Sequence, residues 1–132
     1  MYTPENIEQI IQNKEYALLE FKSAKNNFDS RDRADYCAGM ANAGGGKMLL
    51  GVMNNGKIVG TTVYFGTIEK IPHEVNQSIG IWVKVEEVQH PTGRVVVFDI
   101  PSRPAGQRVR SNGHYTYPIR KGESLVEMND SD

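Results

Sequence analysis

Two glutamates and a lysine near the start of the chain have types and a spacing that could support chemistry on a phosphate. Glu15 and Glu20 flank the start of an expected strand, and Lys22 follows two residues later. Because side chains alternate between the two faces of a strand, Glu20 and Lys22 share one face. Two carboxylates can hold Mg²⁺ or Mn²⁺, and a lysine can polarise a phosphate beside the ion. A structural ion pair at the strand edge is the alternative interpretation.

A basic stretch near the C-terminus is the second candidate site. Residues 100–122 contain no acid and five bases, which are Arg103, Arg108, Arg110, Arg120 and Lys121. Tyr115 and Tyr117 alternate on the strand expected to pair with the strand of Arg108 and Arg110. Arginines beside aromatic rings on a sheet suit a phosphate backbone and stacked bases. A hairpin with its tyrosines in the core and its arginines in solvent is the alternative.

The net charge of −1 hides an uneven distribution of charge. Residues 1–20 carry four acids and one base, and residues 123–132 carry four acids and no base. The stretch 21–122 therefore holds fourteen bases and eight acids, a balance of +6. Such local charge steers polyanions more than the total charge does. An ordinary solvated rim is the alternative.

The histidines, the cysteine and a run of glycines indicate structural roles and not catalytic or binding sites. The histidines His73, His90 and His114 are scattered without ligand spacing, so we expect them at the surface or in turns. The one cysteine, Cys37, excludes an internal disulfide, fits a reducing compartment and is predicted to be buried. The glycines at 44–46 lack the spacing of a phosphate-binding loop and predict a tight exit from a helix.

The elements that must position these residues follow from periodicity and turn signals. Helices are predicted over 4–13, from Ser30 as N-cap to the glycines at 44–46, and within 65–79, where Pro72 must start, kink or split the helix. Strands are predicted over 17–21, 47–53, 57–63, 81–88, 94–100, 108–111 and 114–119. The fold class is therefore α+β, with a mixed, largely antiparallel sheet of five to six strands and helices packed mainly on one face.

Length and composition predict a single domain over 1–132, whose acidic end, 123–132, is expected to fray or to begin a linker. No stretch approaches the roughly 18 apolar residues of a membrane helix, and the N-terminus lacks the features of a secretory signal. We therefore expect a cytoplasmic protein without membrane contact.

Several segments together resemble one known family. They are Leu18–Lys22 with its EFK triplet, Cys37–Gly46 (CAGMANAGGG), Met48–Val52 (MLLGV), Gly56–Gly60 (GKIVG) and Tyr115–Gly122 (YTYPIRKG). In this order they resemble the Schlafen-type AlbA-like domain, a DNA-binding type of domain at the N-terminus of many bacterial and archaeal transcriptional regulators and RecG-related proteins. The resemblance covers about residues 10–128, and it is the order and spacing of the motifs that make it specific.

The resemblance implies an α+β domain that binds nucleic acid, often ahead of a further C-terminal domain. In vertebrate Schlafen relatives a similar core is a metal-dependent endoribonuclease that cuts structured RNA, with two glutamates five residues apart and an aspartate after a "GV" strand. Glu15 and Glu20 match the first two positions of that acidic site. The third falls at Met53 or Asn54, where no carboxylate stands. Because an asparagine lacks the charge that holds a hard dication, binding without cleavage is the expected function.

The leading expectation is thus a non-catalytic, nucleic-acid-binding domain of a prokaryotic transcriptional regulator. We expect it to prefer DNA over RNA, to need no cofactor and to be able to form a homodimer. Its expected contacts are Lys22, Lys25, Arg31, Arg33, Arg103, Arg108, Arg110, Arg120 and Lys121. One alternative is a Mg²⁺- or Mn²⁺-dependent endoribonuclease using Glu15, Glu20 and Lys22, and another is a protein-interaction scaffold. The leading expectation requires the cations to form a continuous surface that acids do not neutralise.

Overall fold

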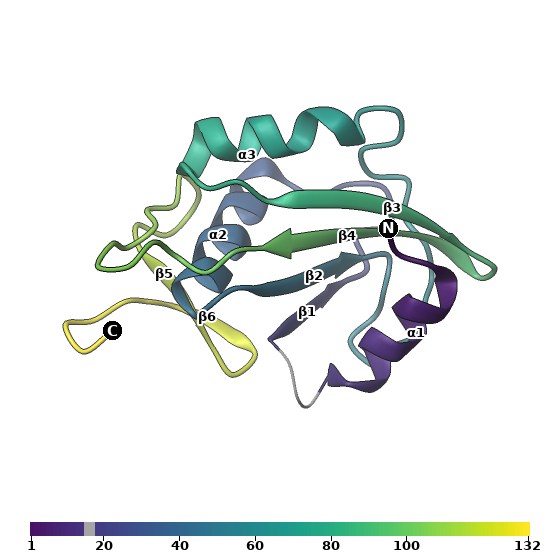
Figure 1. Ribbon diagram of the computed structural model, residues 1–132, viewed down its shortest axis with the longest axis horizontal. Coiled ribbons are helices and arrows are strands. Elements are labelled where there is room, and N and C mark those ends of the chain that lie inside the picture. Colours follow the sequence, from purple (N-terminus) through teal and green to yellow (C-terminus); the bar gives the residue numbers. More distant parts are fainter. Residues whose placement is uncertain (15–17) are drawn as a thin grey trace.

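A four-stranded mixed sheet forms the centre of the molecule, of which the computed structural model describes residues 1–14 and 18–132. The strands are β1 (Leu19–Lys22), β2 (Gly46–Leu50), β3 (Lys84–His90) and β4 (Gly93–Ile100). Their order across the sheet is β1-β2-β4-β3 (Figure 1). β1 and β2 run parallel, whereas β4 is antiparallel to both of its neighbours. The predicted α+β class with a mixed sheet is confirmed.

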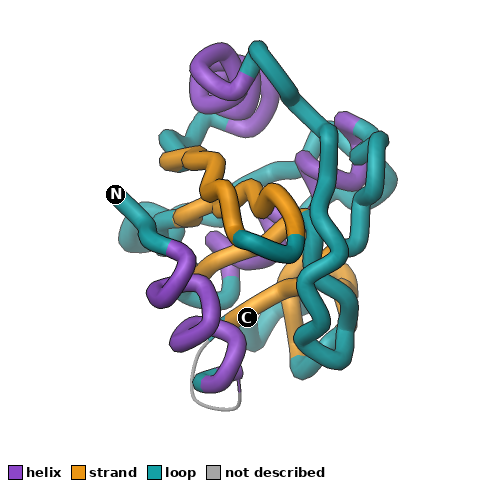
Figure 2. Tube along the Cα trace, turned by 90° about the vertical axis from the view of Figure 1, so that its right-hand side faces the viewer, coloured by secondary structure: helices purple, strands orange, loops and turns teal. Residues whose placement is uncertain are grey.

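Helices cover both faces of this sheet and divide the core into two layers. The α2 (Ser30–Asn42) and α3 (Ile71–Ile79) helices pack on one face around Met48 and Phe98, and a short 3₁₀ turn, η2 (Ile68–Lys70), precedes α3. The α1 helix (Pro4–Gln12) covers part of the other face through Ile7, which packs near Val97. Figure 2 shows α1, the helix that begins just after the N-terminus, at the side of the strands. No helix in the described part of the chain is both long and apolar enough to cross a membrane.

Local signals in the sequence account for the starts of the helices α1 and α2. Thr3 caps α1 by accepting a hydrogen bond from the Asn6 amide at 3.1 Å. The N-cap of α2 is Asp29, which accepts from the Arg31 amide at 2.7 Å, and not Ser30 as expected. A carboxylate one residue before the helix reaches this amide and also complements the positive end of the helix dipole.

The glycines after α2 have the conformational role that the sequence predicts. Gly44 and Gly45 have φ angles of +113° and +89°, which L side chains rarely adopt. A Cβ atom on Gly45 would lie 2.8 Å from the Ile100 carbonyl oxygen. The chain therefore leaves α2 through two residues in the conformation that favours glycine, and at Gly45 there is also no room for a side chain. Cys37, which faces the sheet from α2, is fully buried, and burial raises the pKa of its thiol to about 12.

A separate hairpin of β5 (Pro118–Lys121) and β6 (Ser124–Glu127) lies beside α2 (Figure 1). It packs closely on Gly39 of α2, where a Cβ atom would lie 2.5 Å from the end of the Leu125 side chain. The hairpin turns at 122–123, so the expected pairing of 108–111 with 114–119 is wrong. The segment expected as a frayed end supplies β6.

The expected strand over 57–63 is also wrong, because only one bridge forms there, between Val52 and Ile58. Gly51 and Gly60 both have positive φ angles, and the Gly51 carbonyl accepts hydrogen bonds from the amides of Val59 and Gly60. This local turn bends the chain away from the preceding strand before further strand pairs can form. Pro72, by contrast, lies in the first turn of α3 and starts the helix, one of the positions that the sequence allowed.

Candidate nucleic-acid interface

Glu20, Lys22 and Arg120 form a polar cluster where β1 meets the β5–β6 hairpin. Arg120 Nε donates a hydrogen bond to Glu20 Oε1 at 2.9 Å, and Arg120 also donates to the Leu19 carbonyl. The Lys22 ammonium lies 3.8 Å from the other Glu20 oxygen and donates to the Tyr36 hydroxyl at 2.8 Å. Glu20 is only 8% exposed, so this carboxylate is neutralised inside the protein. Glu15, the other expected metal ligand, lies outside the described residues.

The position of the third expected acid carries no negative charge either. Met53 is exposed, and the Asn54 carbonyl accepts a hydrogen bond from the Lys14 ammonium at 3.2 Å. A cavity of about 170 Å³ at this point is lined by Lys14, Glu20, Phe21, Lys22, Tyr36, Asn54, Arg120 and Glu123. With three cations and two carboxylates in its described lining, the cavity favours an anion over a divalent metal ion.

This cavity is the middle part of a longer groove. A cavity of about 590 Å³ adjoins it and shares Tyr36 and Glu123. Another, of about 420 Å³, shares Phe21, Lys22 and Asn54 on the other side. The groove therefore runs from the start of α2, past β1 and the hairpin, to the turn at 53–55.

The segment 107–118 carries two of the expected cations, Arg108 and Arg110, and is fixed to α2 by two buried polar side chains. Asn42 accepts from the Val109 amide at 2.8 Å and donates to the carbonyls of Val109 and Pro118 at 2.9 and 2.7 Å. Because Asn42 is 4% exposed, these bonds are shielded from water. These bonds pair backbone groups of Val109 and Pro118 that we expected to pair with a neighbouring strand.

Asp35 of α2 holds the middle of this segment. Its carboxylate accepts hydrogen bonds from the Ser111 hydroxyl at 2.6 Å and from the amides of His114 and Tyr115 at 2.9 and 3.2 Å. Burial by itself would raise the pKa of Asp35, but these donors outweigh it and hold the pKa below its usual value. A charged Asp35 therefore sets the conformation of the loop at 111–115.

Three of the expected contact residues, Lys25, Arg31 and Arg110, are exposed and have no acidic partner among the described residues. Arg110 lies 5.9 Å from the centre of the Tyr117 ring, an arrangement typical of a cation–π contact. Arg31 lies beside the same loop, because a Cβ atom on Gly113 would lie 2.2 Å from the Arg31 carbonyl oxygen. Among the described residues, no acidic side chain lies within salt-bridge distance of Lys25, Arg31 or Arg110.

Arg33 and Arg120 do not suit the role expected of them. Their side chains are 9% and 7% exposed, and each pairs with an acid, Arg33 with Glu74 at 3.4 Å and Arg120 with Glu20. Sequence spacing alone did not show that α2 turns Arg33 toward the core, where the Tyr64 ring lies 5.7 Å away. The expected cationic surface is therefore interrupted at these two positions.

The last residues of the chain cover three further expected cations. Arg103 and Arg108 donate to the backbone oxygens of Asp132 and Asn129 at 2.8 and 2.9 Å. Lys121 pairs with the Asp132 carboxylate at 2.8 Å. Residues 129–132, which we name the acidic turn, therefore occupy donors that a phosphate would otherwise use.

One cluster of chemical groups escapes prediction from the sequence. The His114 Nδ1 atom lies 3.0 Å from Asp35 Oδ2 and 3.5 Å from Asp32 Oδ1, in the 590 Å³ end of the groove. Asp32 and Asp35 are three residues apart on α2, a spacing that places side chains on one helical face. The spacing of the two aspartates could have indicated part of this cluster. The sequence could not indicate the histidine, which is 79 residues away from Asp35.

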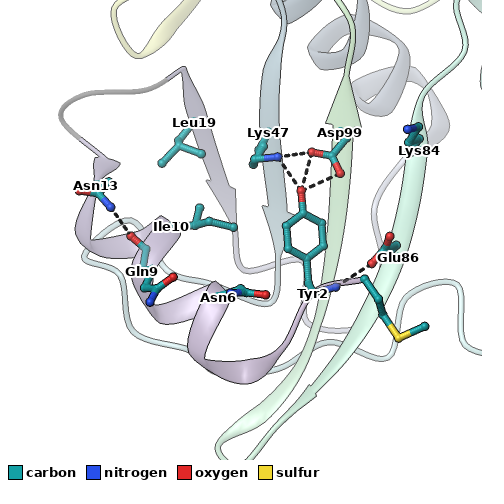
Figure 3. Close-up of a pocket in the computed structure, with 11 residues that line it drawn as sticks. Tyr2, Asn6, Gln9, Ile10, Asn13, Leu19, Lys47, Lys84, Glu86 and Asp99 are labelled. Atoms are coloured by element: carbon teal, nitrogen blue, oxygen red, sulfur yellow. Dashed lines mark hydrogen bonds and ion pairs between the residues drawn. The ribbon is translucent and has the colours of Figure 1, made fainter.

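A cavity of similar size, about 590 Å³, lies on the opposite face of the sheet, beside α1. Figure 3 shows the Tyr2 hydroxyl pointing toward Lys47 and Asp99, which come from the neighbouring strands β2 and β4. Tyr2 donates to Asp99 at 2.7 Å, and Lys47 donates to both of the others. Burial raises the pKa of Tyr2, so its hydroxyl stays protonated. None of the expected contact residues is in the described lining of this cavity.

Comparison with known proteins places the chain in a family. The family model described as "Schlafen, AlbA_2" matches residues 15–129. The chain belongs to this family. No match is found among curated proteins.

Two solved structures share the fold of this AlbA_2 domain. The DIP2311 protein from Corynebacterium diphtheriae aligns over 92% of the chain with 20% identity and a TM-score of 0.72. The N-terminal domain of a RecG-related protein (ATP-dependent DNA helicase) from Nitrosomonas europaea aligns over 100% with 14% identity and a TM-score of 0.61. The match spans 29% of the diphtheria protein and 92% of the N. europaea domain.

Proposed function

We propose that this AlbA_2 domain binds nucleic acid through its backbone phosphates, with duplex DNA preferred over RNA, and does not cut it. The observation that carries the proposal is Arg110, which is exposed, lies against Tyr117 and belongs to a segment that Asp35 and Asn42 fix to α2. A guanidinium group on such a rigid segment loses little conformational entropy when it binds a phosphate. Arg31 and Lys25 add exposed positive charge.

Family membership supports the same proposal. The structurally similar domain from N. europaea belongs to a protein named for a DNA helicase, and this favours DNA as the ligand. Contacts from Arg110, Arg31 and Lys25 to phosphates would position the domain on a duplex without reading its sequence. A role in a transcriptional regulator would then require sequence readout from other residues or another domain.

The surroundings of Glu20 support binding without cleavage. A divalent metal ion at Glu20 would have to displace Arg120 at 2.9 Å and would lie close to Lys22. Met53 and Asn54 offer no second carboxylate there. The cavity instead suits a phosphate oxygen, which Lys22 and Lys14 can approach.

An electrophoretic mobility assay on the chain tests the proposal. The probes are duplex DNA, single-stranded DNA and tRNA, each with and without Mg²⁺ and Mn²⁺. We expect a shifted duplex band in every condition, a weaker shift of tRNA, and intact probes after long incubation. Metal-dependent cutting of tRNA that is lost in Glu20→Ala would contradict the non-catalytic function, and the absence of any shift would contradict binding.

A further inference from the structure

We propose that Asp32, Asp35 and His114 form a binding site for one Zn²⁺ ion at the α2 end of the groove. The three side chains each offer a ligand atom, and these atoms all lie within 4.8 Å of one another. An imidazole with two carboxylates suits Zn²⁺ and similar transition metals better than Mg²⁺ or Ca²⁺, which prefer oxygen ligands alone.

The distances within the cluster fit a zinc ion. Zinc binds nitrogen and oxygen ligands at about 2.0–2.2 Å, so two ligand atoms on a tetrahedron are about 3.4 Å apart. His114 Nδ1 lies 3.0 Å from Asp35 Oδ2 and 3.5 Å from Asp32 Oδ1. The ion requires Nδ1 to offer its lone pair, so the ring proton then resides on Nε2.

Asp35 has the surroundings of an oriented metal ligand. Its Oδ1 atom accepts from the Ser111 hydroxyl and the Tyr115 amide, while Oδ2 accepts from the His114 amide. One lone pair of Oδ2 is left, directed at the His114 ring. Such outer hydrogen bonds fix the orientation of metal-binding side chains and raise affinity.

The charge of this end of the groove supports a cation. The Asp35 side chain is 3% exposed, and within the described chain its one ion-pair partner is His114, which is charged only when protonated. The described lining of the 590 Å³ cavity contains three carboxylates, from Asp32, Asp35 and Glu123, and no lysine or arginine. The hydrogen bonds to Asp35 keep its carboxylate charged, and a dication would supply the positive charge that this lining lacks.

The site differs from the cluster around Glu20 at the middle of the groove, where Lys14, Lys22 and Arg120 favour an anion. Three protein ligands leave a fourth coordination position on zinc, open to water or to a phosphate oxygen at the cavity mouth. The inference does not depend on the proposed function, because metal binding is measured without nucleic acid.

The test uses the chain without an affinity tag, stripped of metal with a chelator. Co²⁺ is titrated as a spectroscopic substitute for Zn²⁺, and Zn²⁺ binding is measured by calorimetry. We expect one ion per chain, the visible absorption band of four-coordinate cobalt, and loss of the band when Zn²⁺ is added.

Two variants test which residues bind the ion. Asp32→Asn leaves the hydrogen bonds of Asp35 intact, so it should fold normally, as circular dichroism would verify. It should weaken Zn²⁺ binding at least about tenfold, and His114→Ala should do so as well. The matched controls Asp130→Asn and His73→Ala should bind as the unchanged chain does. Absence of stoichiometric binding, or equal binding by folded Asp32→Asn, would overturn the proposal.

Discussion

Glu20 and Arg120 are 100 residues apart in sequence, yet their side chains form a 2.9 Å hydrogen-bonded ion pair that is shielded from water. The pair joins the edge strand β1 to the β5–β6 hairpin. It also neutralises the one acid of the expected catalytic site that lies within the described residues. The same contact therefore bears on stability and on function.

Replacing Arg120 tests the structural part of this contact. Arg120→Met leaves the Glu20 carboxylate buried without a partner other than Lys22, so the free energy of unfolding should fall by about 3–5 kcal/mol. Urea denaturation measures the change. Arg110→Met, at an exposed arginine, should alter it by less than about 0.5 kcal/mol. Equal stability of the two variants would show that the pair does not hold the hairpin.

The lowered pKa of Asp35 predicts a dependence of stability on pH. Because hydrogen bonds hold the folded-state pKa below the ordinary value of 3.8, the contribution of Asp35 is complete above that value and is lost as the pH falls below it. Thermal unfolding between about pH 5 and pH 2.5 measures this loss. In Asp35→Asn the corresponding part of the acid transition should be missing, whereas Asp130→Asn should retain it.

Asn42 offers a test of how the segment 107–118 is held. Asn42→Leu removes three buried hydrogen bonds and leaves the amide of Val109 without its acceptor, so we expect a loss of about 2–3 kcal/mol. Hydrogen exchange should accelerate at Val109 before it does in the central sheet. Unchanged protection of Val109 would mean that the backbone of the segment is fixed in some other way.

The acidic turn predicts a gain in nucleic-acid binding. Asp132→Asn removes the charge that pairs with Lys121, so one more cation becomes available to phosphate. The salt dependence of duplex binding should then steepen by about 0.9 in log–log slope. Asp130→Asn makes the same change in net charge at an exposed acid and is the matched control. If both variants gain equally, the effect comes from total charge and not from Lys121.

Local patterns predicted the parts of this molecule that depend on near neighbours. Thr3 before Pro4 located the start of α1, and the glycines at 44–46 located the tight turn into β2. The expected pairing of 108–111 with 114–119 failed because Asp35 and Asn42, far away in sequence, take up the backbone groups of that segment. Local turn preference cannot anticipate a buried side chain on another element that binds the same amides.

The sequence predicted which types of residue line the candidate site, but not which side chains contact one another there. The sequence indicated that Glu20 and Lys22 share a face, and both line one cavity. It gave no sign that Arg120 would neutralise Glu20 or that His114 would meet Asp32 and Asp35. The Arg120 contact depends on how the hairpin packs against α2 beside Gly39, and the His114 contact depends on the loop whose amides Asp35 binds.

The central claim is that exposed cations around the 107–118 segment bind phosphates, and fluorescence anisotropy with labelled duplex DNA between 50 and 200 mM salt tests it most directly. We expect affinity to fall by roughly fortyfold across this range, as three phosphates neutralised by Lys25, Arg31 and Arg110 imply, and the log–log slope to decrease by about 2 in Arg31→Ala/Arg110→Ala. The control Lys70→Ala/Lys84→Ala carries the same charge change at exposed lysines elsewhere and should keep the slope of the unchanged chain. Affinity that is independent of salt, or equal loss in the two double variants, would contradict the claim.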